Sequence, residues 1–255
     1  MQLKSPDDLA RMRDAARIVR AILDEVSGAA MAGTSTAELD RLAEARTRER
    51  GAVPAFKGYH GYPASICISV NDEVVHGIPS PSRVLRDGDL VGLDFGVLLR
   101  GFHGDAAQTV VVGQGSAEAL RLIEATRAAL ASGIAAARSG GRVGDIGAAV
   151  QGSAEAAGFS VVRDFVGHGI GRKLHEPPQI PNFGRAGTGA WLRPGLVLAI
   201  EPMVNAGSPG VRTLEDGWTA VTQDGSLSAH FEHTVAVTEE GPEILTACNP
   251  ENRML

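Results

Sequence analysis

The chain has 255 residues, of which 44% are hydrophobic, so it is long enough to bury a sizeable core and has the composition of an ordinary globular protein. Its net charge of -6 comes from interspersed acidic and basic residues, which provide no positively charged surface for nucleic acid or anionic lipid. No apolar stretch approaches the ~20 residues that span a membrane, and the charged N-terminus has no signal-peptide core.

We therefore expect a single domain, residues 1–255, because no Pro-, Ser- or Gly-rich linker separates its halves. The two cysteines, Cys67 and Cys248, are too few for a disulfide framework, and a reducing cytoplasm is the default compartment for such a chain. Neither nucleic acid nor a membrane is expected as a partner.

Helices are predicted in two pairs. Ser5-Pro6, followed by two aspartates, is typical of a helix start, since Ser caps the first turn and Pro fits its first position. A second helix is predicted from the Ser35–Glu38 capping box to Gly51. The second half of the chain has counterparts of both helices, at residues 117–137 and 143–157.

Residues 56–80 are predicted to form a loop with short strands. Tyr59 and Tyr62 stand there beside Gly and Pro. They could fill the core, but two tyrosines in a loop-rich stretch suit the wall of a pocket. The same stretch contains Cys67 and His76.

The rest of the chain is organised around a predicted hairpin, Leu90–Val112. Strand alternation places Asp94 on one face and its apolar neighbours on the other, and Asp105 on the facing strand has the parity of Ala107 and Thr109. The hairpin then presents two carboxylates side by side. Burying both is costly unless a cation lies between them, and a divalent metal is the usual solution. Two surface aspartates on an edge hairpin would explain these residues equally well.

A second copy of the pattern favours the metal. Leu85–Asp94 aligns without a gap with Leu192–Glu201, so that carboxylate falls on carboxylate. The same offset aligns Gly33 with Gly140, Glu38 with Asp145, Leu39 with Ile146 and Gly51 with Gly158. A later hairpin, Trp218–Val237, is predicted to turn at Asp224-Gly225 and to supply Glu232. Two related halves would thus each donate two carboxylates to a common centre.

Gly167–Gly171 superficially resembles a phosphate-binding loop, but it lacks the Gly-Lys-Ser/Thr ending. We interpret its glycines as residues that let the backbone bend, so that His168 is aimed at the centre. His175 follows in a loop stiffened by Pro177-Pro178. A lone histidine is more often a satisfied structural residue than a ligand, and that interpretation is kept for His60, His103, His230 and His233.

Two Asp, two Glu and one imidazole make an oxygen-dominated site that suits two divalent ions about 3.5–4 Å apart. Such a pair lowers the pKa of a bound water towards about 7–9, so hydrolysis is the natural reaction. The sequence contains neither the H-E-x-x-H motif of zinc proteases nor a G-x-S-x-G elbow, and Cys67 has no nucleophile motif around it. A nucleophilic side chain is therefore disfavoured.

Taken together, these motifs resemble those of the bacterial type I methionine aminopeptidases of peptidase family M24, along nearly the whole chain. The motifs are Gly58-Tyr59-His60-Gly61-Tyr62-Pro63, Val75-His76-Gly77-Ile78-Pro79, Asp94-Phe95-Gly96, Gly104-Asp105, Gly167-His168-Gly169-Ile170-Gly171, His175-Glu176, Ile200-Glu201-Pro202-Met203, Asp216-Gly217-Trp218 and Phe231-Glu232-His233-Thr234. The resemblance implies an α+β pita-bread fold with pseudo-two-fold symmetry. It also implies a hydrolase that removes the N-terminal methionine of peptides and nascent chains when the second residue is small.

The resemblance implies a role for each site residue. The ligands of two divalent ions (Co, Mn, Fe or Zn) would be Asp94, Asp105, His168, Glu201 and Glu232. Asp105 and Glu232 would be shared by both ions, and Glu201 would also carry the proton of the attacking water. His175 would hydrogen-bond the substrate carbonyl, and His76 would contact the scissile amide nitrogen.

Substrate selection would follow from the pocket. The resemblance implies that the methionine side chain is bound by Tyr59, Tyr62, Cys67 and Trp218. Two positions depart from the commonest family pattern: Phe56 replaces a frequent Cys, and Leu174 replaces a frequent aromatic residue. The fit of methionine would change at these positions without effect on the metal ligands. A monomer is expected.

Two alternatives remain open from the sequence. A proline-specific peptidase would share this fold and ligand set, although such relatives usually carry an additional N-terminal domain. A binding module that has lost catalysis would share the fold alone, but all five ligand positions and both auxiliary histidines are occupied here by residues able to act.

Overall fold

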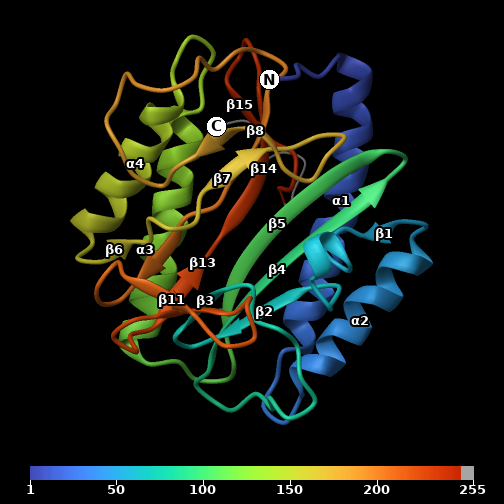
Figure 1. The fold of residues 1–255 in the computed structure, drawn as a ribbon, viewed down its shortest axis with the longest axis vertical. Coiled ribbons are helices and arrows are strands. Elements are labelled where there is room, and N and C mark those ends of the chain that lie inside the picture. Colours follow the sequence, from blue (N-terminus) through green and yellow to red (C-terminus); the bar gives the residue numbers. More distant parts are fainter. Residues whose placement is uncertain (248–255) are drawn as a thin grey trace.

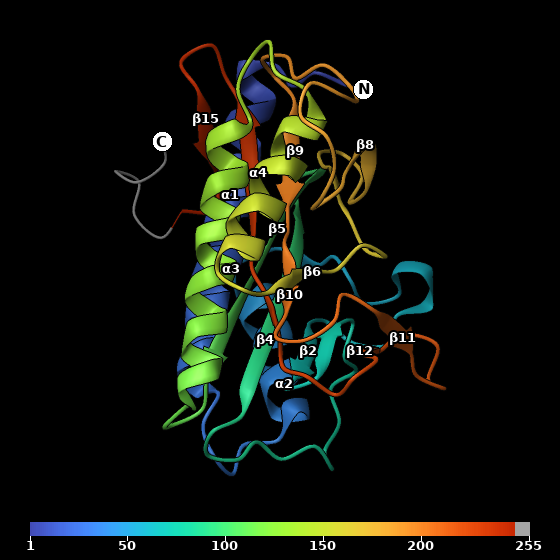
Figure 2. The same ribbon diagram turned by 90° about the vertical axis from the view of Figure 1, so that its left-hand side faces the viewer.

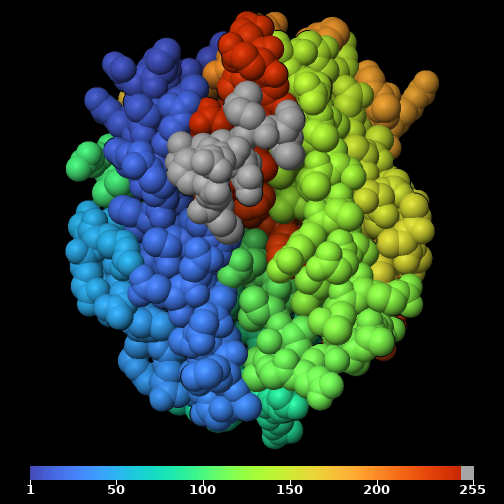
Figure 3. All heavy atoms as spheres, turned by 180° about the vertical axis from the view of Figure 1, so that it is seen from behind, coloured from blue at the N-terminus to red at the C-terminus, as the bar shows by residue number. Residues whose placement is uncertain are grey.

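The structure is a computed structural model that describes residues 1–247; Cys248 lies outside these residues. A curved nine-stranded antiparallel sheet runs through the molecule, with strand order β1-β4-β5-β14-β9-β7-β8, in which β2 also pairs with β4 and β15 with β14. Four helices cover one face of this sheet, as Figures 1 and 2 show. From behind, α1 and α2 in blue and α3 and α4 in yellow-green form the covering layer (Figure 3).

The helices begin and end close to their predicted positions. Their bounds are α1 Pro6–Ala29, α2 Thr36–Glu49, α3 Ala117–Ala136 and α4 Val143–Ala156, with a short 3-10 helix at Tyr59–Gly61. At the start of α1, the Ser5 hydroxyl accepts a hydrogen bond from the Asp8 amide at 3.2 Å, and the Asp8 carboxylate accepts one from the Ser5 amide at 3.1 Å. This reciprocal pair satisfies two backbone donors that the helix cannot pair itself, which is why the start could be predicted locally.

The strands are short except in the central hairpin. They are β1 Val53–Pro54, β2 Cys67–Val70, β3 Glu73–Val75, β4 Leu90–Leu99, β5 Phe102–Val111, β6 Ser160–Val161, β7 Gly167–Gly169, β8 Glu176–Ile180, β9 Val197–Ile200, β10 Met203–Asn205, β11 Val211–Thr213, β12 Ala220–Thr222, β13 Ser228–His230, β14 Glu232–Val237 and β15 Pro242–Ile244. Two three-stranded sheets, β13-β10-β6 and β11-β12-β3, flank the large one.

The internal repeat is visible in the structure. The second helix of each pair starts at Thr36 and at Val143, which is the same separation as that between Asp94 and Glu201. An isolated bridge precedes each of these helices, Ser35 with Val84 and Arg142 with Trp191, and the four residues keep the same offset. Because β5 pairs with β14, the two halves contribute to one sheet.

The apolar face of the β4–β5 hairpin lies against the helices. Val91, Leu93, Phe95 and Val97 are all fully buried there, in one cluster with residues of α1 and α2. A second cluster packs α3 and α4 against the other half of the sheet. The polar face of the hairpin is thereby directed away from the helices. Along residues 1–247, no helix is both long and apolar enough to cross a membrane.

The prediction of a hairpin over Trp218–Val237 is wrong. The turn at Asp224-Gly225 exists, with Gly225 at a φ of +74°, but β12 pairs with β3 and β11, whereas β13 pairs with β10. The Asp224 carboxylate accepts a hydrogen bond from the Ser208 amide at 2.6 Å, so the turn is tied to a different segment. Asp-Gly chemistry specifies a reversal of the chain, not the strands that pair around it.

Candidate metal centre

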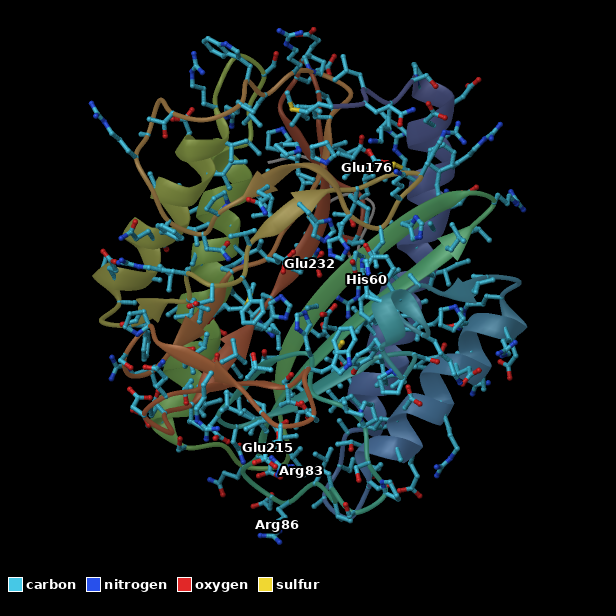
Figure 4. All side chains as sticks on the ribbon, viewed as in Figure 1. His60, Arg83, Arg86, Glu176, Glu215 and Glu232 are labelled. Carbon is cyan, nitrogen blue, oxygen red and sulfur yellow. The ribbon has the colours of Figure 1, made fainter. Side chains whose placement is uncertain are left out.

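The central hairpin positions two carboxylates on the polar face of the sheet. Asp94 of β4 pairs with Ala107, and Asp105 of β5 pairs with Gly96, so the two aspartates are diagonal neighbours on one face. On the next strand, Glu232 of β14 pairs with the same Ala107. Figure 4 shows Glu232 near the middle of the sheet, with His60 in the neighbouring 3-10 helix.

The second half of the sheet supplies an imidazole and a fourth carboxylate. His168 of β7 pairs with Ala199 of β9, and Glu201 directly follows β9. Nε2 of His168 lies 3.5 Å from Oε1 of Glu201. One ligand atom from each of Asp105, His168 and Glu232 lies within 4.8 Å of the others. The sheet therefore brings together all five predicted ligands, and all five line one cavity.

The chemistry of this cluster fits a divalent cation. Asp94 Oδ1, Asp105 Oδ1 and Glu232 Oε1 are buried and have no hydrogen-bond partner within residues 1–247. Burial raises the pKa of Asp94 to about 7. Burial first, and the neighbouring carboxylates second, raise the pKa of Asp105, Glu201 and Glu232 well above the usual range. A bound divalent ion would supply the missing partner and reverse this preference for the protonated form.

His168 is held in the orientation that a ligand needs. Its Nδ1 donates a hydrogen bond to the Gly169 carbonyl at 2.9 Å, which leaves the lone pair on Nε2 directed towards the carboxylates. Burial, and then the nearby His175, lower its pKa to about 3. The imidazole is therefore neutral at pH 7 and able to bind a metal.

The structure adds a second reason for the glycines around His168. Gly167 and Gly169 lie in β7 and neither is among the residues with positive φ. A Cβ on Gly167 would lie 2.3 Å from the Ala199 carbonyl oxygen, and one on Gly169 would lie 2.5 Å from that of Pro177. The glycines allow close approach of the two neighbouring strands, and the pairing of β7 with β8 is irregular between His168 and Gly169.

Two further histidines reach the same cavity. Nδ1 of His175 lies 2.7 Å from the Tyr59 hydroxyl, and its ring centroid lies 4.1 Å from that of His168. His76 has a φ of +62° and meets the Phe165 ring edge to face at 5.3 Å. Burial lowers the pKa of His76 to about 4, so its ring is neutral at pH 7.

The cavity has a volume of about 230 Å³, below the ~300–1,000 Å³ of sites for drug-sized ligands, and it suits a single side chain. Besides the five predicted ligands and the other histidines, it is lined by Phe56, Tyr59, Tyr62, Cys67, Leu174 and Trp218. The Tyr62 hydroxyl donates to the Gly77 carbonyl at 2.9 Å, and its ring meets Trp218 at 5.1 Å. The predicted pocket residues thus lie together.

Sequence reasoning missed His230 and His60. His230 is 3% exposed, and its Nε2 has no hydrogen-bond partner in the part of the chain that is described. It lies two residues before Glu232, and this spacing, which places two side chains of an extended chain on the same face, could have indicated it. His60 lines the cavity. The structural interpretation holds for His103, hydrogen-bonded to the Gly171 carbonyl at 3.2 Å, and for His233, bonded to Thr246 at 2.8 Å.

The centre and the fold define a class of protein. The model of metallopeptidase family M24 matches residues 10–239, and the chain belongs to this family. Within it, the chain belongs to the methionine aminopeptidases. The methionine aminopeptidase of Clostridium perfringens is 54% identical over 244 residues, which cover 96% of this chain and 98% of that protein.

Solved structures agree with this assignment. The crystal structure of methionine aminopeptidase from Thermotoga maritima superposes with a TM-score of 0.95 at 46% identity, covering 96% of this chain and 99% of that one. The prolidase from Pyrococcus furiosus superposes with a TM-score of 0.79 at 22% identity over 97% of this chain and 66% of its own. That second likeness shows the fold alone. The α+β pita-bread fold expected from the sequence is confirmed.

Proposed function

We propose that this chain removes the N-terminal methionine from peptides and nascent proteins whose second residue is small. The observation that carries the proposal is the position of the apolar cavity, which is lined at once by the five clustered ligands and by Tyr62, Cys67 and Trp218. A side chain bound among these aromatic residues would bring its own peptide bond beside the carboxylates. The unbranched thioether side chain of methionine suits a small cavity with such an aromatic lining.

The centre would hold two divalent ions, Co, Mn, Fe or Zn, through Asp94, Asp105, His168, Glu201 and Glu232. The observation behind this is the set of buried carboxylate oxygens that lack any partner among the described residues. When bound, such ions lower the pKa of a coordinated water and so supply hydroxide at neutral pH. Asp105 and Glu232, which lie on neighbouring strands, would be shared between both ions.

Two of these residues and two histidines would also act on the water or the peptide. Glu201 would take the proton of the attacking water and deliver it to the leaving amine, so that one water is added across the scissile bond. His175 would donate a hydrogen bond to the carbonyl oxygen as charge develops on it. His76 would contact the amide nitrogen, and Asp94 would lie near the substrate's N-terminal amine. The neutral state of His76 at pH 7 lets it approach that nitrogen without repelling the amine.

A peptide panel tests the proposal. Chelator-treated protein is supplied with Mn, Fe, Co or Zn under anaerobic conditions and is offered Met-Ala-Ser, Leu-Ala-Ser and Ala-Pro peptides. Metal-dependent release of methionine alone is the expected result, and it ranks the metals. Cleavage of Ala-Pro would instead assign the chain to the proline-specific activity. Silence with every metal, in protein shown to bind metal, would leave the binding-module alternative.

The proposed substrate also sets the place of action. Nascent chains emerge in the cytoplasm, and we propose that the protein acts there as a monomer, with no nucleic-acid or membrane partner. Light scattering after size-exclusion chromatography, at micromolar protein with metal present, checks the oligomeric state. A mass twice that of the 26.5 kDa chain would contradict the monomer.

A further inference from the structure

A buried ion pair ties the N-terminal segment to the loop that carries His175. Nζ of Lys4 lies 2.6 Å from Oε2 of Glu176, and the two side chains are only 4% and 7% exposed. Lys4 precedes α1, whereas Glu176 directly follows His175 in the sequence. Removing two charges from water offsets most of what their attraction contributes, so such a pair adds little net stability. The ion pair matters more for the chain segments that it holds in position.

Both partners of the pair are fixed by further hydrogen bonds. The Lys4 amide donates to the Gly195 carbonyl at 2.7 Å, and its Nζ donates to the Gln2 carbonyl at 3.0 Å. On the other side, the Lys173 amide donates to Oε1 of Glu176 at 3.2 Å. Glu176 therefore uses one oxygen to hold its own loop and the other to hold Lys4.

The surrounding backbone is packed closely around this ion pair. A Cβ on Gly171 would lie 2.3 Å from Lys4 Cε and 2.8 Å from Glu176 Oε1. Gly195 has a φ of +87°, and a Cβ there would lie 2.9 Å from the Lys4 carbonyl oxygen. The loop, the Lys4 segment and the turn at Gly195 are thus packed against one another through glycines.

His175 itself has few restraints of its own. His175 is exposed, and within residues 1–247 its side chain makes one hydrogen bond, with the Tyr59 hydroxyl. Its position therefore depends on its two neighbours in the chain: Leu174 is 3% exposed, and Glu176, which begins β8, pairs with Gly169 of β7 and makes the ion pair with Lys4. A second link between α1 and this loop, Arg172 to Asp8 at 3.1 Å, is solvent-exposed and contributes little. Figure 4 shows Glu176 on the side of the site that faces the upper part of α1.

We propose that Lys4, acting through Glu176, is a positioning residue that holds the His175 imidazole where it meets the substrate carbonyl. The inference rests on the role proposed above for His175. The inference means that the segment before the first helix contributes to the function of the site, although this segment is remote in sequence from every predicted site residue. Lys4 does not contact the substrate; it orients the residue that does.

The test compares Lys4→Met with Arg13→Met in metal-verified protein. Arg13 is a matched control, because it is a second basic residue near the N-terminus that makes an ion pair, with Glu243 at 2.7 Å, and neither partner lines the cavity. Lys4→Met should lower kcat on Met-Ala-Ser by about 10- to 100-fold, the range for a misplaced catalytic group, with KM within about twofold. Arg13→Met should leave both constants unchanged, whatever it does to Tm.

A double-mutant cycle separates positioning from stability. In a His175→Ala background, Lys4→Met should cause no further loss of kcat, since the residue that it positions is already absent. An equal loss in both backgrounds, or an unchanged kcat in Lys4→Met, would overturn the inference. If Lys4→Met does not fold, Glu176→Gln replaces it in the same cycle with the same expected and contrary outcomes.

The two proposals can fail separately. Full turnover by His175→Ala would remove the proposed role of His175 and, with it, this inference. A loss in His175→Ala together with a wild-type kcat in Lys4→Met would overturn the inference while the proposed function stands.

Discussion

Nε2 of His230 lies 3.9 Å from Oε2 of Glu201, while Nε2 of His168 lies 3.5 Å from Oε1 of the same carboxylate. One carboxylate is thus placed between two buried imidazoles. Burial first, and His76 second, lower the pKa of His230 to about 3, so both rings are neutral at pH 7. The proposed proton carrier, Glu201, has one oxygen near His168, a proposed ligand, and the other near His230, a potential hydrogen-bond donor.

Replacing His230 should therefore weaken metal binding. A donor behind a ligating carboxylate typically changes affinity by about 10- to 100-fold, and His230→Leu removes that donor without adding a charge. We expect Mn²⁺ to bind His230→Leu at least about tenfold more weakly by calorimetric titration, and His230→Gln, which keeps an N–H group, to lose less. Equal affinity in the wild type and both variants would show that the second oxygen of Glu201 needs no partner.

Removing one carboxylate should stabilise the metal-free protein. Burial, followed by Asp105, Glu201 and Asp94, raises the pKa of Glu232 well above its usual range, because four acidic groups share the site. Glu232→Gln removes one of them with little change in volume. The free energy of unfolding of the metal-free variant, measured by urea titration, should therefore be about 1–3 kcal/mol higher than that of the wild type. The same variant should bind fewer than two Mn²⁺ ions. Two tightly bound ions would contradict the assignment of Glu232 as a shared ligand.

Local and non-local features differ in how far the sequence predicted them. Helix starts at Ser5 and Ser35 follow from caps made within four residues, and the shared face of Asp94 and Asp105 follows from strand alternation. The pairing partners of β12 and β13 did not follow, because a turn motif describes only the reversal itself.

The features that were missed depend on segments far apart in the chain. A Cβ on Gly169 would meet a carbonyl oxygen of the neighbouring strand. The lack of a hydrogen-bond partner for Nε2 of His230 among residues 1–247 is a property of the packed interior. Lys4 and Glu176 are separated by 172 residues, and nothing local in either sequence stretch indicates the pair. The symmetry of the two halves was the exception, because an unbroken alignment of the chain with itself is visible without any structure.

Lowering the pH should destabilise the protein through His76. Burial lowers its pKa to about 4, whereas in the unfolded chain it takes up a proton near pH 6.5. The contribution of its neutral ring is fully present above about pH 6.5 and is lost as the pH falls towards about 4, by up to about 3 kcal/mol.

His76→Gln isolates this contribution, since the other buried groups titrate in both proteins. Urea unfolding of metal-free protein between pH 4 and pH 7.5 should show the variant losing less stability than the wild type as the pH falls. Parallel curves over the whole range would show that His76 is protonated as easily in the folded state as in the unfolded one.

Phe56 should limit the length of the side chain that the cavity accepts. It is 8% exposed and packs in one cluster with Tyr62, Cys67 and Leu174, and a Cβ on Gly96 would lie 2.8 Å from its ring. Phe56→Cys opens the wall at this point. Since one methylene in an apolar pocket changes kcat/KM by about 10- to 200-fold, the ratio for an ethionine peptide over a methionine peptide should rise about tenfold. Leu120→Ala, at an exposed residue of α3, is the matched control and should leave the ratio unchanged. An unaltered ratio in Phe56→Cys would place the boundary of the pocket elsewhere.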